Sequence, residues 1–265
     1  MFIERLISGI ILVILTIAAI WVGHPILLGV VCIVSLIGQF ELYRVLKLEK
    51  NVLGIAGYIA TIGYELLLLY NKENYMQVFV FSVMLVFMAI YVILYPKYTF
   101  KEIAMVFVGV VYVTMMLSSL YQTRCMDGGI YLVWIVFISA WGSDTCAYCV
   151  GKFFGKHKLP SKLSPKKTIE GCTGGVIGAM IIAAIYAYIF KDNLEMHGCS
   201  IALFTIVGGL GAICSQIGDL AASAIKRNYQ VKDYGTLIPG HGGIMDRFDS
   251  ILFTAPLAFI FFKFI

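Results

Sequence analysis

The residues best suited to chemistry lie in one stretch, 216–250, between two apolar runs. It contains four of the fifteen acidic residues of the chain, together with four cations and the glycine-rich turn 239–243. The acidic residues are Asp219, Asp233, Asp246 and Asp249, and the cations are Lys226, Arg227, Lys232 and Arg247. In a chain this apolar, carboxylates, cations and glycines gathered in one place indicate a site for a charged substrate or a metal ion.

The helix that leads into this stretch is expected to carry three of these groups on one stripe. If it continues to Arg227, then Asp219, Ser223 and Lys226 follow at positions i, i+4 and i+7 of one helical face. An acid, a hydroxyl and a cation are thereby directed into one pocket. The loop that follows adds Lys232.

The turn and the start of the next helix complete this part of the candidate site. Gly242 and Gly243 permit positive φ angles and a close approach of backbone amides to a ligand. We interpret His241 as a structural or phosphate-contacting histidine, because Mg²⁺ prefers oxygen ligands. Asp246 and Asp249 are predicted to begin the next helix three residues apart and so to share a face.

Asp144 is an ionisable residue inside a run of about twenty apolar and small residues. A carboxylate buried in such a run costs several kcal/mol unless it is paired, protonated or bound to a metal. Tyr148 at i+4 falls on the same helical face. A structural hydrogen bond between helices is the alternative interpretation, and we favour a functional role.

A basic segment follows, with six lysines and one histidine across the sixteen residues 152–167. Such a cluster also suits a topology signal that binds anionic lipid. Lys166 and Lys167 precede Thr168, which can cap a helix start, and a helix N-terminus beside lysines favours phosphate binding. Glu170 could cap, pair with a lysine or approach a metal, and the sequence does not distinguish these roles.

The four candidate metal ligands are carboxylates from three different apolar spans, namely Asp144, Asp219, Asp246 and Asp249. Hard divalent cations such as Mg²⁺ take oxygen ligands, usually one or two carboxylates plus waters and substrate phosphates. Convergence of three helices on a metal ion and a phosphate chain is what phosphoryl or nucleotidyl transfer in a membrane requires.

The elements that must position these residues are membrane-spanning helices. The chain has 265 residues, 60% hydrophobic and 13% charged, which is too apolar for a soluble domain. We predict an all-α, polytopic transmembrane bundle of about nine spans. The expected spans are 6–22, 26–43, 52–70, 75–95, 103–121, 130–150, 173–190, 201–222 and 250–264. Residues 1–22 resemble a signal peptide, but the similar spans that follow favour an uncleaved first helix.

The basic residues predict the orientation of the spans. With the N-terminus in the cytoplasm, sixteen of the twenty Lys and Arg residues fall on the cytoplasmic side. The polar site is therefore expected to open to the cytoplasmic face. The first part of the chain, 1–125, is predicted to hold five spans of little chemical interest, and 126–265 the catalytic part. In the first part, Glu41 and Arg44 are interpreted as a surface pair, and Glu65 as snorkelling or pairing with Lys72.

These residues resemble the CDP-diacylglycerol synthase (phosphatidate cytidylyltransferase) family. The family's C-terminal signature has Ser-x-apolar-Lys-Arg, then Lys-Asp, then a Gly/Pro turn with His-Gly-Gly-apolar-x-Asp-Arg-apolar-Asp. The matching residues here are Ser223, Lys226, Arg227, Lys232, Asp233, His241, Gly242, Gly243, Asp246, Arg247 and Asp249. Segments 143–145 and 164–171 resemble other recurrent segments of the family, and Cys146 stands where it often has Gly. The resemblance covers roughly 139–250.

The resemblance implies that CTP and phosphatidate react to give CDP-diacylglycerol and pyrophosphate, with a divalent cation, Mg²⁺ or Mn²⁺. We assign metal binding to Asp219 and Asp246 as a hypothesis, with Asp144 and Asp249 as further ligands or orienting groups. Phosphates would be held by basic residues, with Ser223 and His241 assisting. Those basic residues are Lys166, Lys167, Lys226, Arg227, Lys232 and Arg247. The lipid bilayer and the cytoplasmic (inner) membrane are the expected surroundings, and a homodimer is left open.

Two other functions compete with this interpretation. A CTP-dependent kinase of a lipid alcohol would transfer the γ-phosphoryl group and release CDP. A transporter of an anionic solute would use intramembrane acids for ion coupling, but no inverted repeat is found and the charges cluster on one face. Nucleic acid is not an expected partner, because nothing resembles a nucleic-acid-binding module.

Overall fold

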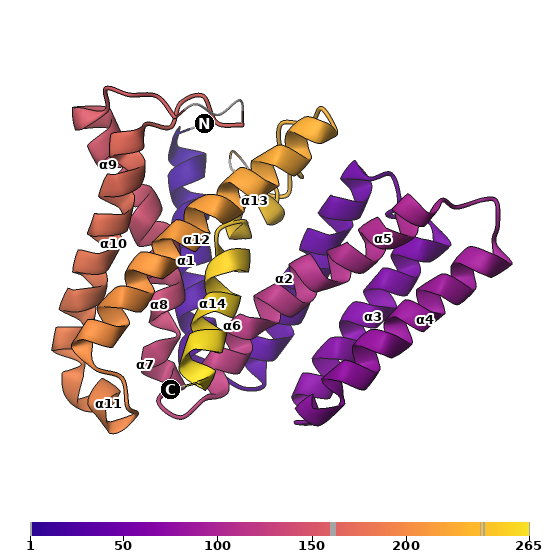
Figure 1. Cartoon of the computed structure of the whole chain (residues 1–265), viewed down its shortest axis with the longest axis horizontal. Helices are drawn as coiled ribbons and strands as arrows, with labels where there is room; N and C mark the ends of the chain where they lie inside the picture. Colours follow the sequence, from indigo (N-terminus) through magenta and orange to yellow (C-terminus); the bar gives the residue numbers. More distant parts are fainter. Residues whose placement is uncertain (1, 160–162, 239, 241, 265) are drawn as a thin grey trace. The chain divides into compact units, whose positions relative to one another are not determined.

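The protein is all-helical, as the sequence predicts (Figure 1). The computed structural model describes residues 2–159, 163–238, 240 and 242–264, with side chains from residue 7 onward. In this part of the chain there are two isolated β-bridges and no strand. Long apolar segments form helices because a helix satisfies its own backbone donors and acceptors, which a lipid environment demands.

The helices of the first half are α1 (Phe2–Val22), α2 (Ile26–Val45), α3 (Val52–Leu69), η1 (Glu73–Tyr75), α4 (Met76–Ile93), α5 (Phe100–Gly109), η2 (Val110–Met115) and α6 (Met116–Cys125). The second half contains α7 (Gly129–Leu132), α8 (Trp134–Phe137), η3 (Ile138–Gly142), α9 (Ser143–Phe154), α10 (Ile169–Ile189), α11 (Lys191–Met196), α12 (Ile201–Asn228), α13 (Met245–Phe248) and α14 (Ile251–Lys263). The segments η2 and η3 are π-helical, and each continues a longer helical run.

Within the described residues, seven helical runs are long and apolar enough to cross a membrane. They correspond to the seven predicted spans between 26–43 and 201–222, and several extend further than predicted, as in Phe100–Cys125 and Ile201–Asn228. The predicted first and last spans are shorter apolar helices, Ile7–Val22 and Ile251–Lys263. The chain is therefore a multi-pass membrane protein, and the count of nine spans stays a prediction.

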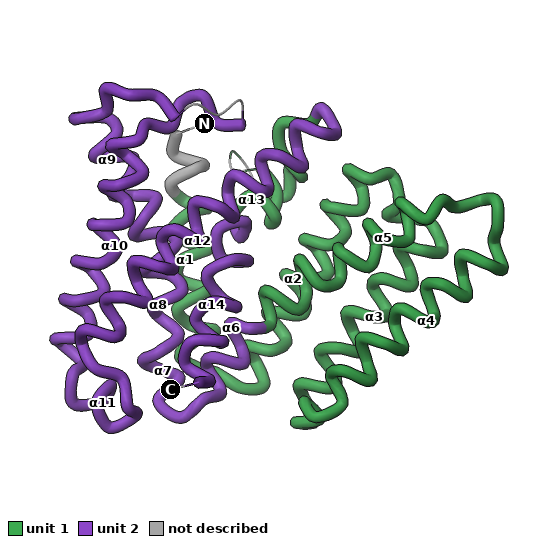
Figure 2. Tube along the Cα trace, in the orientation of Figure 1, with its two compact units in different colours: residues 1–118, 231–247 green, residues 119–230, 248–265 purple. Residues whose placement is uncertain are grey.

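The chain divides into two compact units (Figure 2). Unit 1 comprises residues 1–118 and 231–247, and unit 2 comprises residues 119–230 and 248–265. The sequence suggested a single cut near residue 125. That boundary stays a prediction; within unit 1, the loop 231–247, with part of the candidate site, groups with the N-terminal helices.

Small residues set the packing of unit 2. The buried residues of α10 recur every four positions and are Gly171, Gly175, Ala179, Ala183 and Ala187. This stripe lets α10 pack closely on α9 and α12 (Figure 1). A Cβ atom at Gly208 of α12 would lie 2.6 Å from the Cβ of Ala183. The close packing fixes the helices that carry Asp144 and Asp219.

Unit 1 contains a buried chain of polar side chains between α2, α3 and η2. Thr61 donates to Gln39 Oε1 at 2.8 Å, and its hydroxyl lies 2.7 Å from that of Thr114. One turn further along α3, Glu65 is buried and accepts a 2.7 Å hydrogen bond from Ser118. Glu65 therefore does not snorkel to the edge of its span, contrary to the prediction, and its hydrogen-bond partner is Ser118. These contacts join helices inside a medium that offers no water to polar groups.

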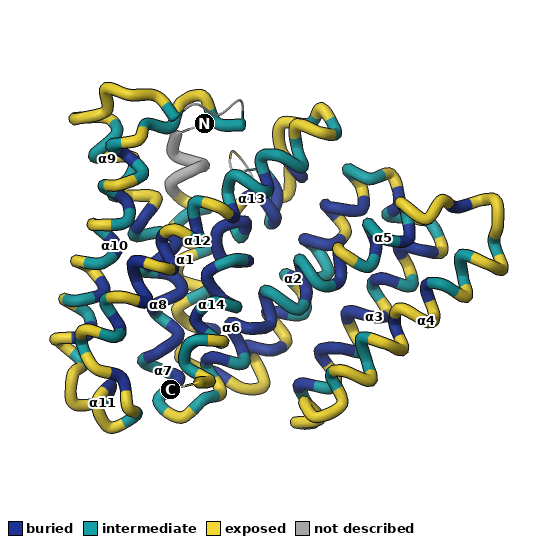
Figure 3. Tube along the Cα trace, viewed as in Figure 1, coloured by how far each residue is buried: buried dark blue, intermediate teal, exposed yellow. Residues whose placement is uncertain are grey.

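Many residues of the long helices are exposed (Figure 3), and a large share of them are large apolar residues. In the run Glu73–Ile93, which includes α4, only 11% of an apolar stretch of 18 residues is buried inside the protein. In α10 the buried share of the corresponding stretch is 22%. Exposed isoleucine, leucine and phenylalanine side chains on such helices are suited to contact with lipid acyl chains. Burial and polarity are concentrated between the helices instead.

Candidate functional site

Three of the predicted aspartates belong to unit 2 and influence one another electrostatically. Asp144 begins α9, Asp219 lies near the end of α12, and Asp249 lies between α13 and α14. Burial raises the pKa of Asp249 to about 7, and the charges of Asp219 and Asp144 act in the same direction. The N–H of Ser250, 2.7 Å from Asp249 Oδ1, and the charge of Lys226 oppose this increase.

The run that leads to Asp144 is not a regular α-helix. The π-helical segment η3 ends at Gly142, directly before Ser143 and Asp144. Such π-helical turns inside α-helices are frequent at functional sites. Asp144 itself is exposed to the cavity described below, so the expectation of a carboxylate buried within its span is wrong.

Asp219 forms an ion pair with one of the predicted phosphate-binding lysines. Lys167 Nζ lies 2.5 Å from Asp219 Oδ2, and both side chains are about a quarter to a third exposed. This contact holds the segment before α10 against α12, which was not predicted. Helix α12 extends beyond the predicted span 201–222 to Asn228, which meets the condition set for the stripe of Asp219, Ser223 and Lys226. Ser223 and Lys226 are half-buried on its last turns, and Arg227 is exposed.

A cavity of about 380 Å³ opens between α9, α10 and α12 within unit 2. Its lining residues are Asp144, Ala147, Tyr148, Gly151, Lys152, Lys166, Lys167, Thr168, Gly171, Cys172 and Gln216. Thr168 is the N-cap of α10, as predicted, and its hydroxyl accepts the N–H of Gly171 at 3.1 Å. The cavity therefore combines one carboxylate, three lysines and a helix N-terminus, which together favour a phosphate group.

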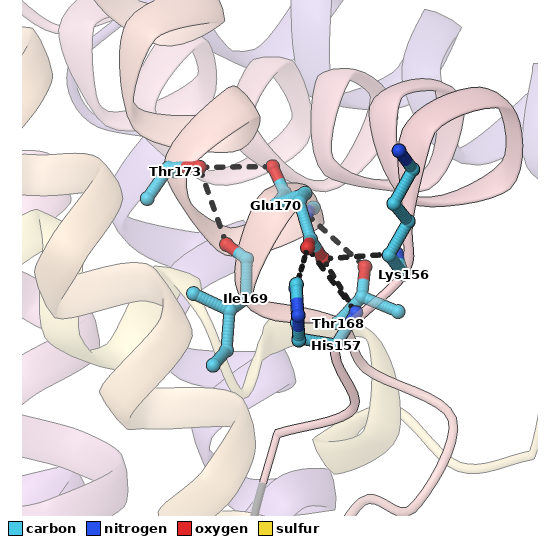
Figure 4. Close-up of polar contacts among 7 residues, drawn as sticks. Lys156, His157, Thr168, Ile169, Glu170 and Thr173 are labelled. Carbon is cyan, nitrogen blue, oxygen red and sulfur yellow. Dashed lines mark hydrogen bonds and ion pairs between the residues drawn. The ribbon is translucent and has the colours of Figure 1, made fainter.

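Glu170 fastens the basic loop to the start of α10 (Figure 4). Its carboxylate accepts the backbone N–H groups of Lys156 and His157 at 3.1–3.2 Å, and one oxygen lies 2.5 Å from His157 Nδ1. The sequence left open a helix cap, a pair with a lysine side chain and a metal contact for Glu170. Its observed partners are two backbone N–H groups and the ring of His157, so these contacts are neither a helix cap nor a pair with a lysine side chain. Glu170 thus holds Lys156 and His157, in the basic segment, against the start of α10.

The fourth aspartate, Asp246, belongs to unit 1 and organises a loop. Its Oδ2 accepts the backbone N–H of Tyr234 at 2.8 Å and of Gly243 at 3.0 Å. The short helix α13 ends at Phe248, so Asp246 and Asp249 do not begin one continuous helix, contrary to the prediction. The convergence of Asp246 with the three aspartates of unit 2 stays a prediction.

A second, polar cavity of about 520 Å³ lies in this loop of unit 1. Its lining residues are Lys232, Asp233, Gly235, Thr236, Ile238, Gly240, Gly242 and Arg247. Gly242 has a φ of 86°, as the predicted role of the turn glycines requires. Lys232 and Arg247 are exposed, Gly243 is buried, and Pro239 and His241 lie outside the described residues.

At this loop the predicted surface position of Glu41 is wrong, whereas Arg44 is exposed as predicted. Glu41, expected on the surface, is buried and accepts the N–H groups of Ile244 at 3.1 Å and Met245 at 2.8 Å. Arg44 donates from Nη2 to the carbonyl of Tyr234 at 2.7 Å. The available signal was the position of Glu41 inside an apolar run, where an ionisable residue is a functional candidate by default.

Carboxylate oxygens are the donors that a magnesium or manganese ion prefers. Among the described residues, no group of three or more His, Cys, Asp and Glu side chains is placed to hold a metal ion. Mg²⁺ usually takes only one or two protein carboxylates, so the donor set still fits such an ion, and metal binding stays a prediction.

Comparison with known proteins gives a consistent result over the whole chain. A sequence model of the cytidylyltransferase family matches residues 3–265. The phosphatidate cytidylyltransferase of Bacillus subtilis is 31% identical over 267 residues, which cover 97% of this chain and 96% of the relative. The phosphatidate cytidylyltransferase of Thermotoga maritima is 30% identical, over 86% of this chain and 93% of the relative. That of Staphylococcus haemolyticus is 38% identical, over 61% of this chain and 59% of the relative. The chain therefore belongs to the cytidylyltransferase family.

Proposed function

We propose that this chain is an integral membrane nucleotidyltransferase that condenses CTP with phosphatidate in phospholipid biosynthesis. The observation that carries the proposal is the similarity, over nearly the whole chain, to relatives named phosphatidate cytidylyltransferase. A phosphate oxygen of phosphatidate attacks the α-phosphorus of CTP. The bond from the α-phosphorus to the bridging oxygen of the β-phosphate breaks, so that CDP-diacylglycerol forms and pyrophosphate leaves.

The nucleophile of this reaction is already ionised at neutral pH, so the site needs no strong general base. Its task is to hold two anionic substrates together and to stabilise the charge that develops on the α-phosphate and the pyrophosphate. Lys166 and Lys167, beside the N-terminus of α10, provide this charge in unit 2. Lys232 and Arg247 provide it in unit 1. Lys226, Arg227 and Ser223 follow on the last turns of α12.

A divalent cation, Mg²⁺ or Mn²⁺, fits the carboxylates and would be held by Asp219 and Asp246, with Asp144 and Asp249 ligating or orienting. When bound it neutralises phosphate charge and polarises the phosphoryl group under attack. The mutual repulsion of the acids in unit 2, which contributes to the raised pKa of Asp249, supports a cation at that point. Lys167 would exchange its contact with Asp219 for a substrate phosphate, leaving the carboxylate to the cation.

The orientation in the membrane follows from the distribution of basic residues. We propose a cytoplasmic N-terminus and a site that opens to the cytoplasm, because sixteen of the twenty Lys and Arg residues then lie on that side. CTP would reach the site from the cytoplasm, while the acyl chains of phosphatidate stay in the cytoplasmic membrane. A homodimer stays a prediction.

The test uses the full-length protein purified in detergent, incubated with CTP, phosphatidate and Mg²⁺. Pyrophosphate release that requires phosphatidate, with formation of CDP-diacylglycerol, is the expected result. Loss of both products in EDTA, and their recovery with added Mg²⁺ or Mn²⁺, checks the cation. Release of CDP with a lipid alcohol as acceptor would overturn the proposal in favour of a kinase.

A further inference from the structure

The loop of unit 1 that carries Lys232, Asp246 and Arg247 is held by a helix more than 180 residues earlier in the chain. The carboxylate of Glu41, near the end of α2, accepts the N–H of Ile244 on Oε1 at 3.1 Å. Its other oxygen, Oε2, accepts the N–H of Met245 at 2.8 Å. Both oxygens of one buried side chain are thus committed to consecutive amides at the start of α13.

The surroundings of Glu41 are shaped to receive this carboxylate. A Cβ atom at Gly235 or at Gly243 would collide with its oxygens, so glycine at both positions lets the loop close around Glu41. Arg44, one turn further along α2, binds the carbonyl of Tyr234 on the other side of the same loop. Helix α2 therefore holds both ends of the segment 234–245 by charged side chains.

The fixed segment also determines the position of groups that could bind substrate. Asp246 spans the same two ends through the N–H groups of Tyr234 and Gly243. Lys232, Asp233 and Arg247 line the polar cavity of the loop beside glycine backbone. The lining residues come from the loop rather than from an apolar span, so the cavity suits a water-soluble polyphosphate better than a phosphate attached to acyl chains.

We propose that Glu41 is a positioning residue that holds the loop 231–247 in the shape that binds the triphosphate of the nucleotide. Glu41 does not touch the substrate. Its two hydrogen bonds fix the start of α13 and the glycine-lined cavity, so that Lys232 and Arg247 are presented to the phosphates before binding. That the bound nucleotide is CTP rests on the proposed function. The attachment of the loop to α2 rests on the hydrogen bonds of Glu41 alone.

The variant that tests this role is Glu41→Gln, which keeps the size of the side chain. One of the two acceptor oxygens becomes an NH₂ group, so either Ile244 or Met245 loses its acceptor and faces a donor. Because a hydrogen bond to a charged group is lost, the KM for CTP is expected to rise about tenfold or more. The KM for phosphatidate should stay within about twofold, because the cavity is lined mostly by polar and glycine residues of the loop and not by a membrane span.

Glu73→Gln is the matched control, because Glu73 is an exposed acid of the same unit, in η1. It makes the same chemical change away from the loop, and both KM values should equal those of the wild type. An equal increase in both KM values for Glu41→Gln, or a fall in kcat alone, would overturn nucleotide positioning, because it would indicate a general loss of structure or a role in the chemical step.

A second measurement separates the role of Glu41 from the proposed reaction. Amide hydrogen–deuterium exchange of the full-length protein in detergent should be faster in peptides of 231–247 for Glu41→Gln, and unchanged in peptides of α3 and α4. If the wild type does not convert CTP and phosphatidate, the proposed function fails, yet this comparison still tests the attachment. Unchanged exchange in 231–247 would overturn the attachment even if the enzyme is active.

Discussion

Replacing Asp219 by Asn separates its observed contact with Lys167 from its proposed contact with a divalent cation. The substitution keeps the volume of the side chain and removes its charge. In the structure the ion pair measures 2.5 Å between Lys167 Nζ and Asp219 Oδ2, with the two side chains 26% and 30% exposed. Asp219 also adds to the negative charge around the buried Asp249.

The effect on stability should be small and the effect on catalysis large. An ion pair this accessible to solvent contributes about 0.2–1 kcal/mol, so the unfolding temperature should fall by at most a few degrees. Removing a carboxylate that holds the cation should cost several kcal/mol of transition-state stabilisation. About 4 kcal/mol corresponds to a loss of about a thousandfold in kcat/KM.

The assay measures pyrophosphate release over a range of Mg²⁺ concentrations for the wild type, Asp219→Asn and Lys167→Met. Lys167→Met removes the same ion pair from the other side and leaves the carboxylate in place. It should lower kcat/KM far less than Asp219→Asn and keep the wild-type Mg²⁺ dependence, whereas Asp219→Asn should require more Mg²⁺. Equal losses with an unchanged Mg²⁺ dependence would refute the reasoning, as would activity of Asp219→Asn within about tenfold of the wild type.

Three further predictions follow from the contacts of individual residues. Thr168→Ala removes the hydroxyl that caps α10 and should cost about 1 kcal/mol of unfolding free energy, and an unchanged thermal midpoint would contradict the cap. Gly208→Val forces side-chain atoms against Ala183 in the packing of α10 on α12, and should lower the thermal midpoint by the equivalent of about 1–3 kcal/mol. Gly29→Ala is its control, because among the described residues the added Cβ would meet no atom within 4 Å beyond its chain neighbours and its own helix backbone, and an equal loss there would argue against the packing explanation. Asp246→Asn should abolish pyrophosphate release while the protein still elutes as a folded species in size-exclusion chromatography, whereas activity near wild type would remove Asp246 from the site.

The course of the spans could be predicted from the sequence because it depends on local composition. Apolar runs of about twenty residues determine where a helix can lie in lipid, and the observed helices follow them. The cap at Thr168 and the continuation of α12 past Arg227 were predictable for the same reason, since each depends on neighbours within a few positions. The π-helical segment before Asp144 left no signal of this kind.

Contacts between distant segments account for the corrections. Glu41 and Met245 are 204 positions apart, and Glu65 and Ser118 are 53 apart. For each acid the sequence suggests only a partner a few positions away, Arg44 for Glu41 and Lys72 for Glu65, because distant contacts leave no local signal. The pairing of Lys167 with Asp219 was hidden in the same way, since it joins the segment before α10 to the end of α12.

The most direct test of the account follows the fate of each phosphate of CTP. The wild-type protein in detergent is given phosphatidate, Mg²⁺ and CTP labelled with ³²P at either the α- or the γ-phosphate. The account predicts that the α-label enters the lipid fraction as CDP-diacylglycerol and that the γ-label is released as pyrophosphate. Transfer of the γ-label into lipid, with the α-label left in CDP, would contradict nucleotidyl transfer.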